Sequence, residues 1–150
     1  MAYPTVQAPY GLKPVNLIGG QVFAGSTREF PIQYGYATNI FYGDFVTIVR
    51  GLATRGAITT ATSSATSGVF LGCSYTNPTT KQKMFSQYWP GGTLAGDAVA
   101  ILTDDPDTVF KTAVVTAQGG STIGSANIAL IGQNVDASNL AGNVNTGNSS

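Results

Sequence analysis

Histidine is absent from this 150-residue sequence, and it has a single cysteine, Cys73. Without histidine the chain cannot form a Ser-His-Asp triad or a His-ligated zinc site, and it lacks the commonest general base. One cysteine excludes an intrachain disulfide and a cysteine-cluster metal site. Cys73 lies inside an apolar run with no base nearby, so we interpret it as a small buried hydrophobic residue rather than a reactive thiol.

Charge is also scarce. Only 9% of the residues are charged, against about 25% in an average soluble domain. Seven basic and seven acidic residues cancel, and Glu29 is the only glutamate. A nucleic-acid-binding surface needs clustered basic side chains, so we expect no nucleic-acid partner. A surface this neutral gains little solubility from charge and suits a protein that neighbours cover in an assembly.

The sequence contains no long apolar run and no phosphate-binding loop. Nowhere do about 20 apolar residues follow one another, so we expect no membrane span. No Gly-rich loop precedes Lys-Ser or Lys-Thr, and the glycines of 119–124 lack the G-x-G-x-x-G spacing of a dinucleotide site. We therefore expect no cofactor.

Short β-branched and aromatic runs, separated by turn residues, fill most of the chain. With 19 glycines and 7 prolines, few windows can sustain a helix of several turns. The pattern predicts an all-β fold, a compact β-barrel or sandwich, of a size that forms one domain. The densest stretch is 68–110, where four apolar runs alternate with turns. We expect strands at 45–50, 57–60, 69–75, 83–89, 98–102 and 108–115, and one or two short strands within 17–33.

Alternation within these strands predicts the core. We expect eight side chains to be largely buried: Val46, Ile48, Val69, Leu71, Phe85, Val99, Ile101 and Phe110. Pro31 should mark an edge strand or a bulge, because proline cannot donate a ladder hydrogen bond.

Both ends of the chain differ from the domain expected at 17–133. Residues 1–16 hold three prolines, which forbid a helix interior or a central strand, so we predict an extended N-terminal arm. Residues 134–150 are rich in Asn, Gly, Ser and Thr, and their composition indicates loop or disorder. This polar C-terminal tail would be a second arm or a truncated continuation of the domain.

We predict that the N-terminal arm is ordered by contact with another chain and not by its own domain. Prolines lower the entropy that docking would cost, and tyrosines cover surface at small entropic cost. A mobile terminus is the alternative. The partner-binding candidates in the arm are Tyr3, Val6, Tyr10 and Leu12.

The cluster Asp104, Asp105 and Asp107 is the one candidate for carboxylate chemistry. Paired carboxylates can hydrolyse glycosides and clustered ones can hold Ca²⁺. These three, however, share one expected loop, whereas a glycosidase needs them on opposite sides of a cleft. Asp-Pro also begins turns, and Asp accepts a hydrogen bond from the backbone two residues on. We interpret the cluster as a turn and expect neither a bound metal nor catalysis.

Tyr88 and Trp89 are adjacent on an expected strand and therefore face opposite sides. One should pack in the core while the other meets solvent, a subunit or a ligand. A sugar-stacking platform is the alternative to core or interface packing. Both residues are partner-binding candidates.

Four segments resemble one family in particular. They read GVFLGCSYTNPTTKQKMFSQYWPGGT at 68–93, DAVAILTDDPDTVFK at 97–111, APYGLKPVNLIGGQVFAGSTREFPI at 8–32 and YGDFVTIV at 42–49. The chain resembles virion structural proteins of tailed bacteriophages, especially phages of cyanobacteria, from about residue 8 to about residue 145. Members of that family continue past the polar tail into further strands, from which this chain departs.

The resemblance implies a head decoration, or cement, protein that binds the outside of the capsid and reinforces it. It implies location on the virion surface, the major capsid protein as partner and no enzymatic activity. Such proteins gain strength from many linked contacts. Closed symmetric oligomers are the rule, and local threefold positions of phage capsids make a homotrimer our first expectation and a dimer the next. The alternative is a receptor- or carbohydrate-binding module of a tail or fibre.

Overall fold

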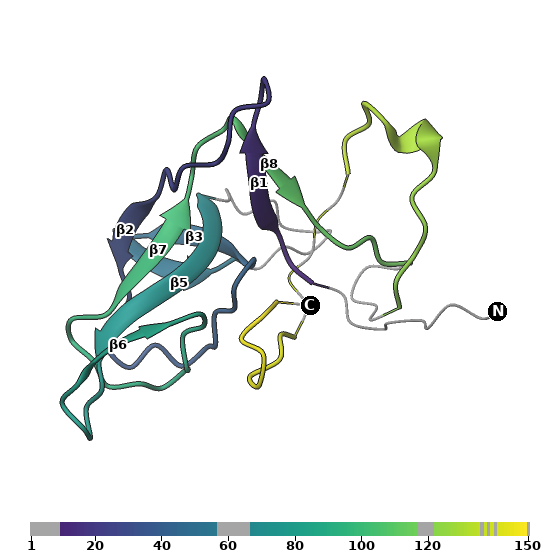
Figure 1. The fold of residues 1–150 in the computed structure, drawn as a ribbon. Helices are drawn as coiled ribbons and strands as arrows, with labels where there is room; N and C mark the ends of the chain where they lie inside the picture. Colours follow the sequence, from purple (N-terminus) through teal and green to yellow (C-terminus); the bar gives the residue numbers. More distant parts are fainter. Residues whose placement is uncertain are drawn as a thin grey trace.

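The computed structural model describes residues 10–56, 67–116, 122–135, 137, 139 and 141–149. The fold is all-β, as the sequence predicts, and its two antiparallel sheets are consistent with a β-sandwich (Figure 1). No helix among the described residues is long and apolar enough to cross a membrane. The elements are β1 (Lys13–Leu17), β2 (Arg28–Pro31), β3 (Phe45–Val49), β4 (Leu52–Arg55), β5 (Gly68–Thr76), β6 (Lys83–Ser86), β7 (Val99–Thr103), β8 (Thr108–Lys111) and the 3₁₀ helix η1 (Ile128–Leu130).

The larger sheet has six strands, built around β5. Its order is β2-β7-β5-β3-β4, and β6 also pairs with β5. β7 runs along one edge of β5, while β3 and β6 pair with its two ends. β2 is an outer strand of this order, so Pro31 lies on an edge, as predicted. The dense stretch 68–110 thus supplies the centre of the sheet.

The partner of β3 is closer in sequence than we predicted. We expected the strand after 45–50 at 57–60, but β4 lies before it at Leu52–Arg55, and 57–60 lies outside the described residues. Val49 pairs directly with Leu52, which leaves Arg50 and Gly51 as a two-residue turn with φ of 54° and 81°. Two positive φ values are typical of a type I′ hairpin turn, whose usual signal is Asn-Gly rather than Arg-Gly.

A bulge in β5 changes which residues face the core. The register of β5 against β7 shifts between Phe70 and Gly72. Phe70 and Cys73 would face opposite sides of a regular strand, yet both are buried in one core cluster. Their partners across the ladder are Leu102 and Ala100, which are also fully buried. β7 itself alternates from Val99 to Leu102, with Ala100 and Leu102 buried. Our prediction placed Val99 and Ile101 in the core and thus chose the wrong face of this strand.

The core prediction is confirmed only in part. Val46 and Val69 are buried, and Ile48 packs against the core. The prediction for Phe85 is wrong, because this residue is 80% exposed. It lies on β6, which ends at Ser86 and does not continue to residue 89 as expected. The four residues that are only partly buried are Leu71, Val99, Ile101 and Phe110. The largest fully buried side chains are Trp89, Phe70, Ile40, Leu102 and Val46.

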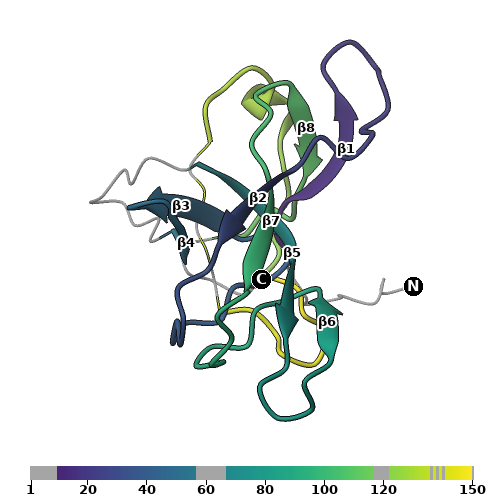
Figure 2. The same ribbon diagram turned by 90° about the vertical axis from the view of Figure 1, so that its left-hand side faces the viewer.

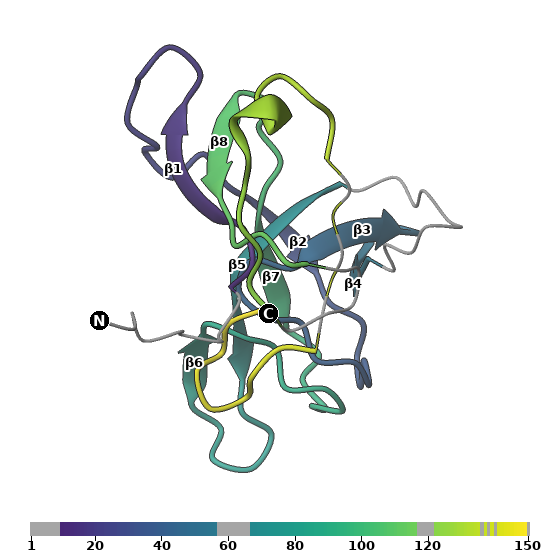
Figure 3. The same cartoon turned by 90° about the vertical axis from the view of Figure 1, so that its right-hand side faces the viewer.

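The smaller sheet, β1 with β8, is called the ribbon below. It stands between the six-stranded sheet and a long excursion of the chain in Figure 1. We call that excursion, residues 112–135, the lobe, and describe it at 112–116 and 122–135. β8 ends at Lys111 rather than at residue 115 as expected, and a single bridge, Val115 with Ile123, pairs the lobe with itself. Turned views show the ribbon and the lobe at the same end of the molecule (Figures 2 and 3).

Candidate partner-binding surfaces

The root of the N-terminal arm is held by its own domain. The Gly11 amide donates to the Ser149 carbonyl at 3.2 Å, and the Leu12 amide donates to the Gly43 carbonyl at 3.1 Å. The Tyr10 carbonyl accepts from the Ala113 amide at 3.4 Å. Our prediction that another chain orders the whole of 1–16 is therefore wrong from residue 10 onward, and 13–16 lie in β1. Tyr3 and Val6 fall outside the described residues.

Close backbone approach explains why this anchoring was not visible in the sequence. A Cβ at Gly43, whose φ is +88°, would lie 2.7 Å from the Leu12 amide nitrogen. A Cβ at Gly11 would lie 2.6 Å from the Ser149 Cβ. Two glycines allow three chain segments to meet at this point. Tyr10 and Leu12 are partly buried there, so their exposed area is smaller than a free arm would offer.

Tyr88 and Trp89 do lie in different environments, as predicted, although β6 ends at Ser86 and neither residue is on that strand. Trp89 is fully buried, and its indole Nε1 donates to the Tyr36 carbonyl at 3.2 Å. It has no exposed surface for a partner or a sugar, which corrects its place among the candidates. Tyr88 is partly buried and stacks on Phe41, with ring centroids 5.7 Å apart. One face of the Tyr88 ring is therefore already occupied.

The three aspartates form the predicted turn. Asp105 Oδ1 accepts from the Asp107 amide at 3.0 Å, the short-range hydrogen bond expected of aspartate in a turn. Asp104 pairs instead with Arg28 at 2.7 Å. Among the described residues, no group of three or more His, Cys, Asp or Glu side chains is placed to hold a metal ion.

Cys73 is buried, as predicted. Burial raises the pKa of its thiol to about 12, and the Sγ contacts the Tyr88 carbonyl at 3.4 Å. A thiol with so high a pKa is not a nucleophile at neutral pH. Its environment is that of a core residue.

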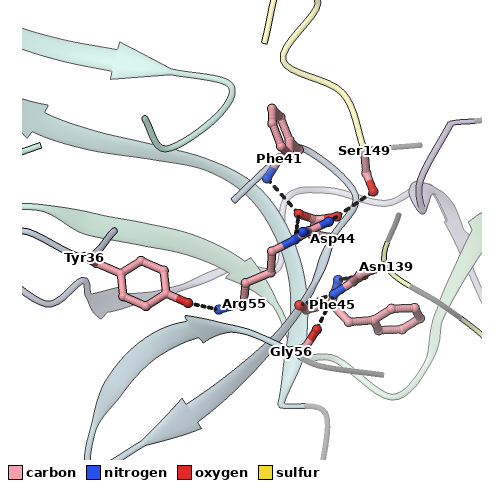
Figure 4. A network of polar contacts seen from close by, with 8 residues as sticks. All are labelled: Tyr36, Phe41, Asp44, Phe45, Arg55, Gly56, Asn139 and Ser149. Carbon is pink, nitrogen blue, oxygen red and sulfur yellow. Dashed lines mark hydrogen bonds and ion pairs between the residues drawn. The ribbon is translucent and has the colours of Figure 1, made fainter. Parts of the chain in front are cut away.

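A cluster of polar side chains joins the polar tail to the domain; we call Asp44, Arg55, Asn139 and Ser149 the polar junction (Figure 4). The Asp44 carboxylate is 0% exposed. It accepts from Arg55 Nε at 2.7 Å, from the Phe41 amide at 2.9 Å and from Ser149 Oγ at 2.5 Å. A buried carboxylate is tolerated only when its oxygens are satisfied in this way.

Asn139 joins the tail to Phe45, the first residue of β3. Its Oδ1 accepts from the Phe45 amide at 3.0 Å, while its Nδ2 donates to the carbonyls of Phe45 at 3.1 Å and Gly56 at 2.7 Å. The side-chain amide thus takes the place of a neighbouring strand. At Asn139 and at 147–149 the tail packs onto the domain rather than extending from it as an arm, and Ser149 is only 3% exposed.

Exposed apolar side chains gather on the ribbon and the lobe, which our sequence reasoning did not single out as surfaces. On and beside the ribbon, the side chains of Val15, Ile18, Val22 and Val109 are 47%, 68%, 78% and 44% exposed. In the lobe, those of Ile128, Ile131 and Val135 are 82%, 78% and 73% exposed. The absence of charged residues from 14–27 and from 112–135 was the signal that could have found most of them.

Comparison with known proteins adds no relative to this picture. No family model matches the chain, no curated protein matches it significantly, and no solved structure does so either.

Proposed function

We propose that this chain is a structural protein of a tailed-phage virion, a decoration protein that binds the outside of the head and stabilises the capsid shell. The four segments that resemble virion structural proteins support the proposal, and the all-β domain suits it. The observation that carries it is the exposed apolar area of the ribbon and the lobe, on a chain with net charge zero. The charged side chains of the ribbon, Lys13 and Lys111, lie together at one end of it. Exposed apolar area of this extent marks an interaction surface.

A reinforcing role needs contacts rather than chemistry. In the described residues the acidic cluster is a turn, the one thiol is buried and the buried carboxylate of Asp44 is fully engaged. We therefore propose a non-enzymatic role with the major capsid protein as partner. The protein would act as a homo-oligomer, with a trimer as our first proposal and a dimer as the second. Each contact with the shell would then be repeated in every subunit of the bound oligomer.

Residues 2–9 remain the proposed shell-contacting arm. They precede the root that the domain holds at Gly11 and Leu12, so a deletion of 2–9 removes the arm and keeps those hydrogen bonds. Deleting 2–13 would also remove the start of β1. The shorter deletion is the informative one.

The test is binding of the purified protein to virion heads stripped of it, together with densitometry of intact particles. We expect high copy number on the head and saturable binding, with melting of the 2–9 deletion unchanged but its binding weakened. Because Lys13 is the only charge in 1–16, binding should depend only weakly on salt. A copy number of only a few per particle, or location on the tail, would refute the decoration role.

A further inference from the structure

We propose that docking of the polar tail controls the root of the N-terminal arm. While the tail is docked, residues 10–12 are fixed to the domain, and when the tail undocks they are released and lengthen the arm. The use of this control rests on the proposed function, because the arm matters only if it contacts the shell. The coupling between tail and root is a property of the isolated chain.

Ser149 connects the tail, the turn before β3 and the arm root (Figure 4). Its carbonyl accepts from the Gly11 amide at 3.2 Å, and its amide donates to the Tyr42 carbonyl at 2.9 Å. Its hydroxyl donates to the buried carboxylate of Asp44. The ladder of β1 begins only at Lys13. Undocking of Ser149 therefore removes the acceptor of a root residue that no strand pairing holds.

Hydrogen bonds and glycine contacts, rather than apolar side chains, hold the described part of the tail beyond residue 140. Val144 is the largest apolar side chain of 141–149, and it is 51% exposed. Gly142 lies against the ring of Phe41, and the Gly147 carbonyl accepts from the Tyr42 amide at 3.0 Å. Water can replace such hydrogen bonds at small net cost. We therefore expect this segment to open locally far more often than the domain unfolds.

Undocking of the tail exposes apolar side chains of the arm root. Tyr10 and Leu12 are partly buried while the root is held. Once released, residues 10–12 would add about 10 Å to the reach of the arm, at about 3.3 Å per residue. A partner that binds the lengthened arm favours the undocked tail. By linkage, an undocked tail strengthens the binding of that partner.

The tail side is tested with Gly142→Ala in the full chain. A Cβ at this position would overlap the Phe41 ring and lie 2.8 Å from the Asn148 carbonyl oxygen, so the tail must shift. These nearest atoms do not belong to the arm root. Gly96→Ala is the matched control, because a Cβ at Gly96 would meet open space.

Amide hydrogen exchange, followed by NMR, is measured at three positions. The Tyr42 amide reports on the docked tail, the Gly11 amide reports on the root, and the amide of buried Ile32 reports on the whole domain. We expect Gly142→Ala to speed exchange at Tyr42 and Gly11 by about tenfold or more and to leave Ile32 unchanged. The control should change none of the three by more than about twofold.

Three results would overturn the proposal. Faster exchange at Tyr42 with unchanged exchange at Gly11 would show that the root does not depend on the tail. Unchanged exchange at Tyr42 would show that the Gly142 contact does not hold the tail. Equal acceleration at Tyr42, Gly11 and Ile32 would show that tail and domain open only as one unit, which contradicts local undocking.

The root side is tested with Gly11→Ala, whose Cβ would lie 2.6 Å from the Ser149 Cβ. Coupling between two sites is reciprocal, so this variant should speed exchange at Tyr42 and leave Ile32 unchanged. Unchanged exchange at Tyr42 would contradict the coupling. Binding to stripped heads separates this proposal from the proposed function. Coupled exchange in a chain that ignores heads would refute the decoration role alone, and uncoupled exchange in a chain that binds them would refute tail control alone.

Discussion

At the polar junction, charged and amide side chains are enclosed by protein, while in the lobe isoleucines stand in solvent. Asp44 is 0% exposed and Ile128 is 82% exposed. The first lies where the arm root, the turn before β3 and the tail converge, and the second lies on η1, on an excursion beyond the ribbon (Figures 1 and 4). Polarity alone would have assigned the two residues to the opposite environments.

The difference shows that a side chain is buried where the same chain brings groups that can bond to it or pack on it, whatever its polarity. Three donors from separate segments reach Asp44, so its carboxylate can leave water without losing hydrogen bonds. In the lobe, Ile128 and Ile131 are 82% and 78% exposed, so the described residues cover little of their side chains. A polar tail can therefore complete a domain, while an apolar run of the same chain remains exposed.

The largest effect is expected at Asp44. Asp44→Ala leaves the guanidinium of Arg55 beside a vacated carboxylate and removes the acceptor of the Phe41 amide. Breaking one partner of a buried pair costs about 3–5 kcal/mol of unfolding free energy. Asp104→Ala is the control, because its partner Arg28 has a side chain 70% exposed, and exposed pairs contribute about 0–1 kcal/mol. Denaturant unfolding measures both; equal losses would contradict the importance of burial here.

The next effect tests the tail directly. Asn139→Ala leaves the amide and carbonyl of Phe45 and the carbonyl of Gly56 without their side-chain partner. Because water can reach part of this edge, we expect a loss of about 2–3 kcal/mol rather than the full penalty for three orphaned groups. Asn145→Ala, at an exposed tail position, should stay within about 0.5 kcal/mol. Hydrogen exchange should show faster exchange of the Phe45 amide in the first variant only.

Local pattern was enough to predict the class of fold and the turn of the aspartate cluster. The strands at 45–49 and 68–76 follow from β-branched runs, and the Asp105 turn follows from a side chain that bonds its own backbone. The burial of Cys73 followed from its apolar neighbours. These features depend on residues a few positions apart, which the sequence displays directly.

Long-range contacts were not predictable in the same way. Asn139 is 94 positions from Phe45, and Ser149 is 105 positions from Asp44, so composition classed the tail as loop or disorder. The bulge between Phe70 and Gly72 shifted the register of β5 against β7, and the Arg50-Gly51 turn placed the partner strand of β3 at 52–55. Each depends on a partner strand or segment that no local pattern identifies.

A smaller effect is expected in the lobe. Ile128→Ala should change the stability of the dilute monomer by no more than about 0.5 kcal/mol, because the side chain has little to lose. Ile40→Ala, at a fully buried position, should cost about 2–5 kcal/mol. If copies associate through the lobe, the melting temperature of the wild type should rise with protein concentration. That rise should be weaker for Ile128→Ala. A large loss of unfolding free energy in the dilute monomer of this variant would instead place Ile128 within the core.

The smallest effect is expected where polar contacts are exposed. Hydrogen bonds from the backbone and hydroxyl of Thr76, and then the Lys83 ammonium, lower the pKa of Asp97 below its ordinary value. A depressed pKa contributes stability above the unfolded value of about 4, and this contribution is lost as the pH falls toward the folded value. Asp97→Asn should therefore melt slightly below the wild type at pH 7, by less than Asn139→Ala does. This difference in melting temperature between Asp97→Asn and the wild type should narrow steadily as the pH is lowered below about 4. Thr76→Val, which removes the hydroxyl donor, should show a similar gap with the same pH trend. A gap that is as large as that of Asp44→Ala, or that does not change with pH, would mean that exposure does not weaken polar contacts in this molecule, and the comparison with the polar junction would fail.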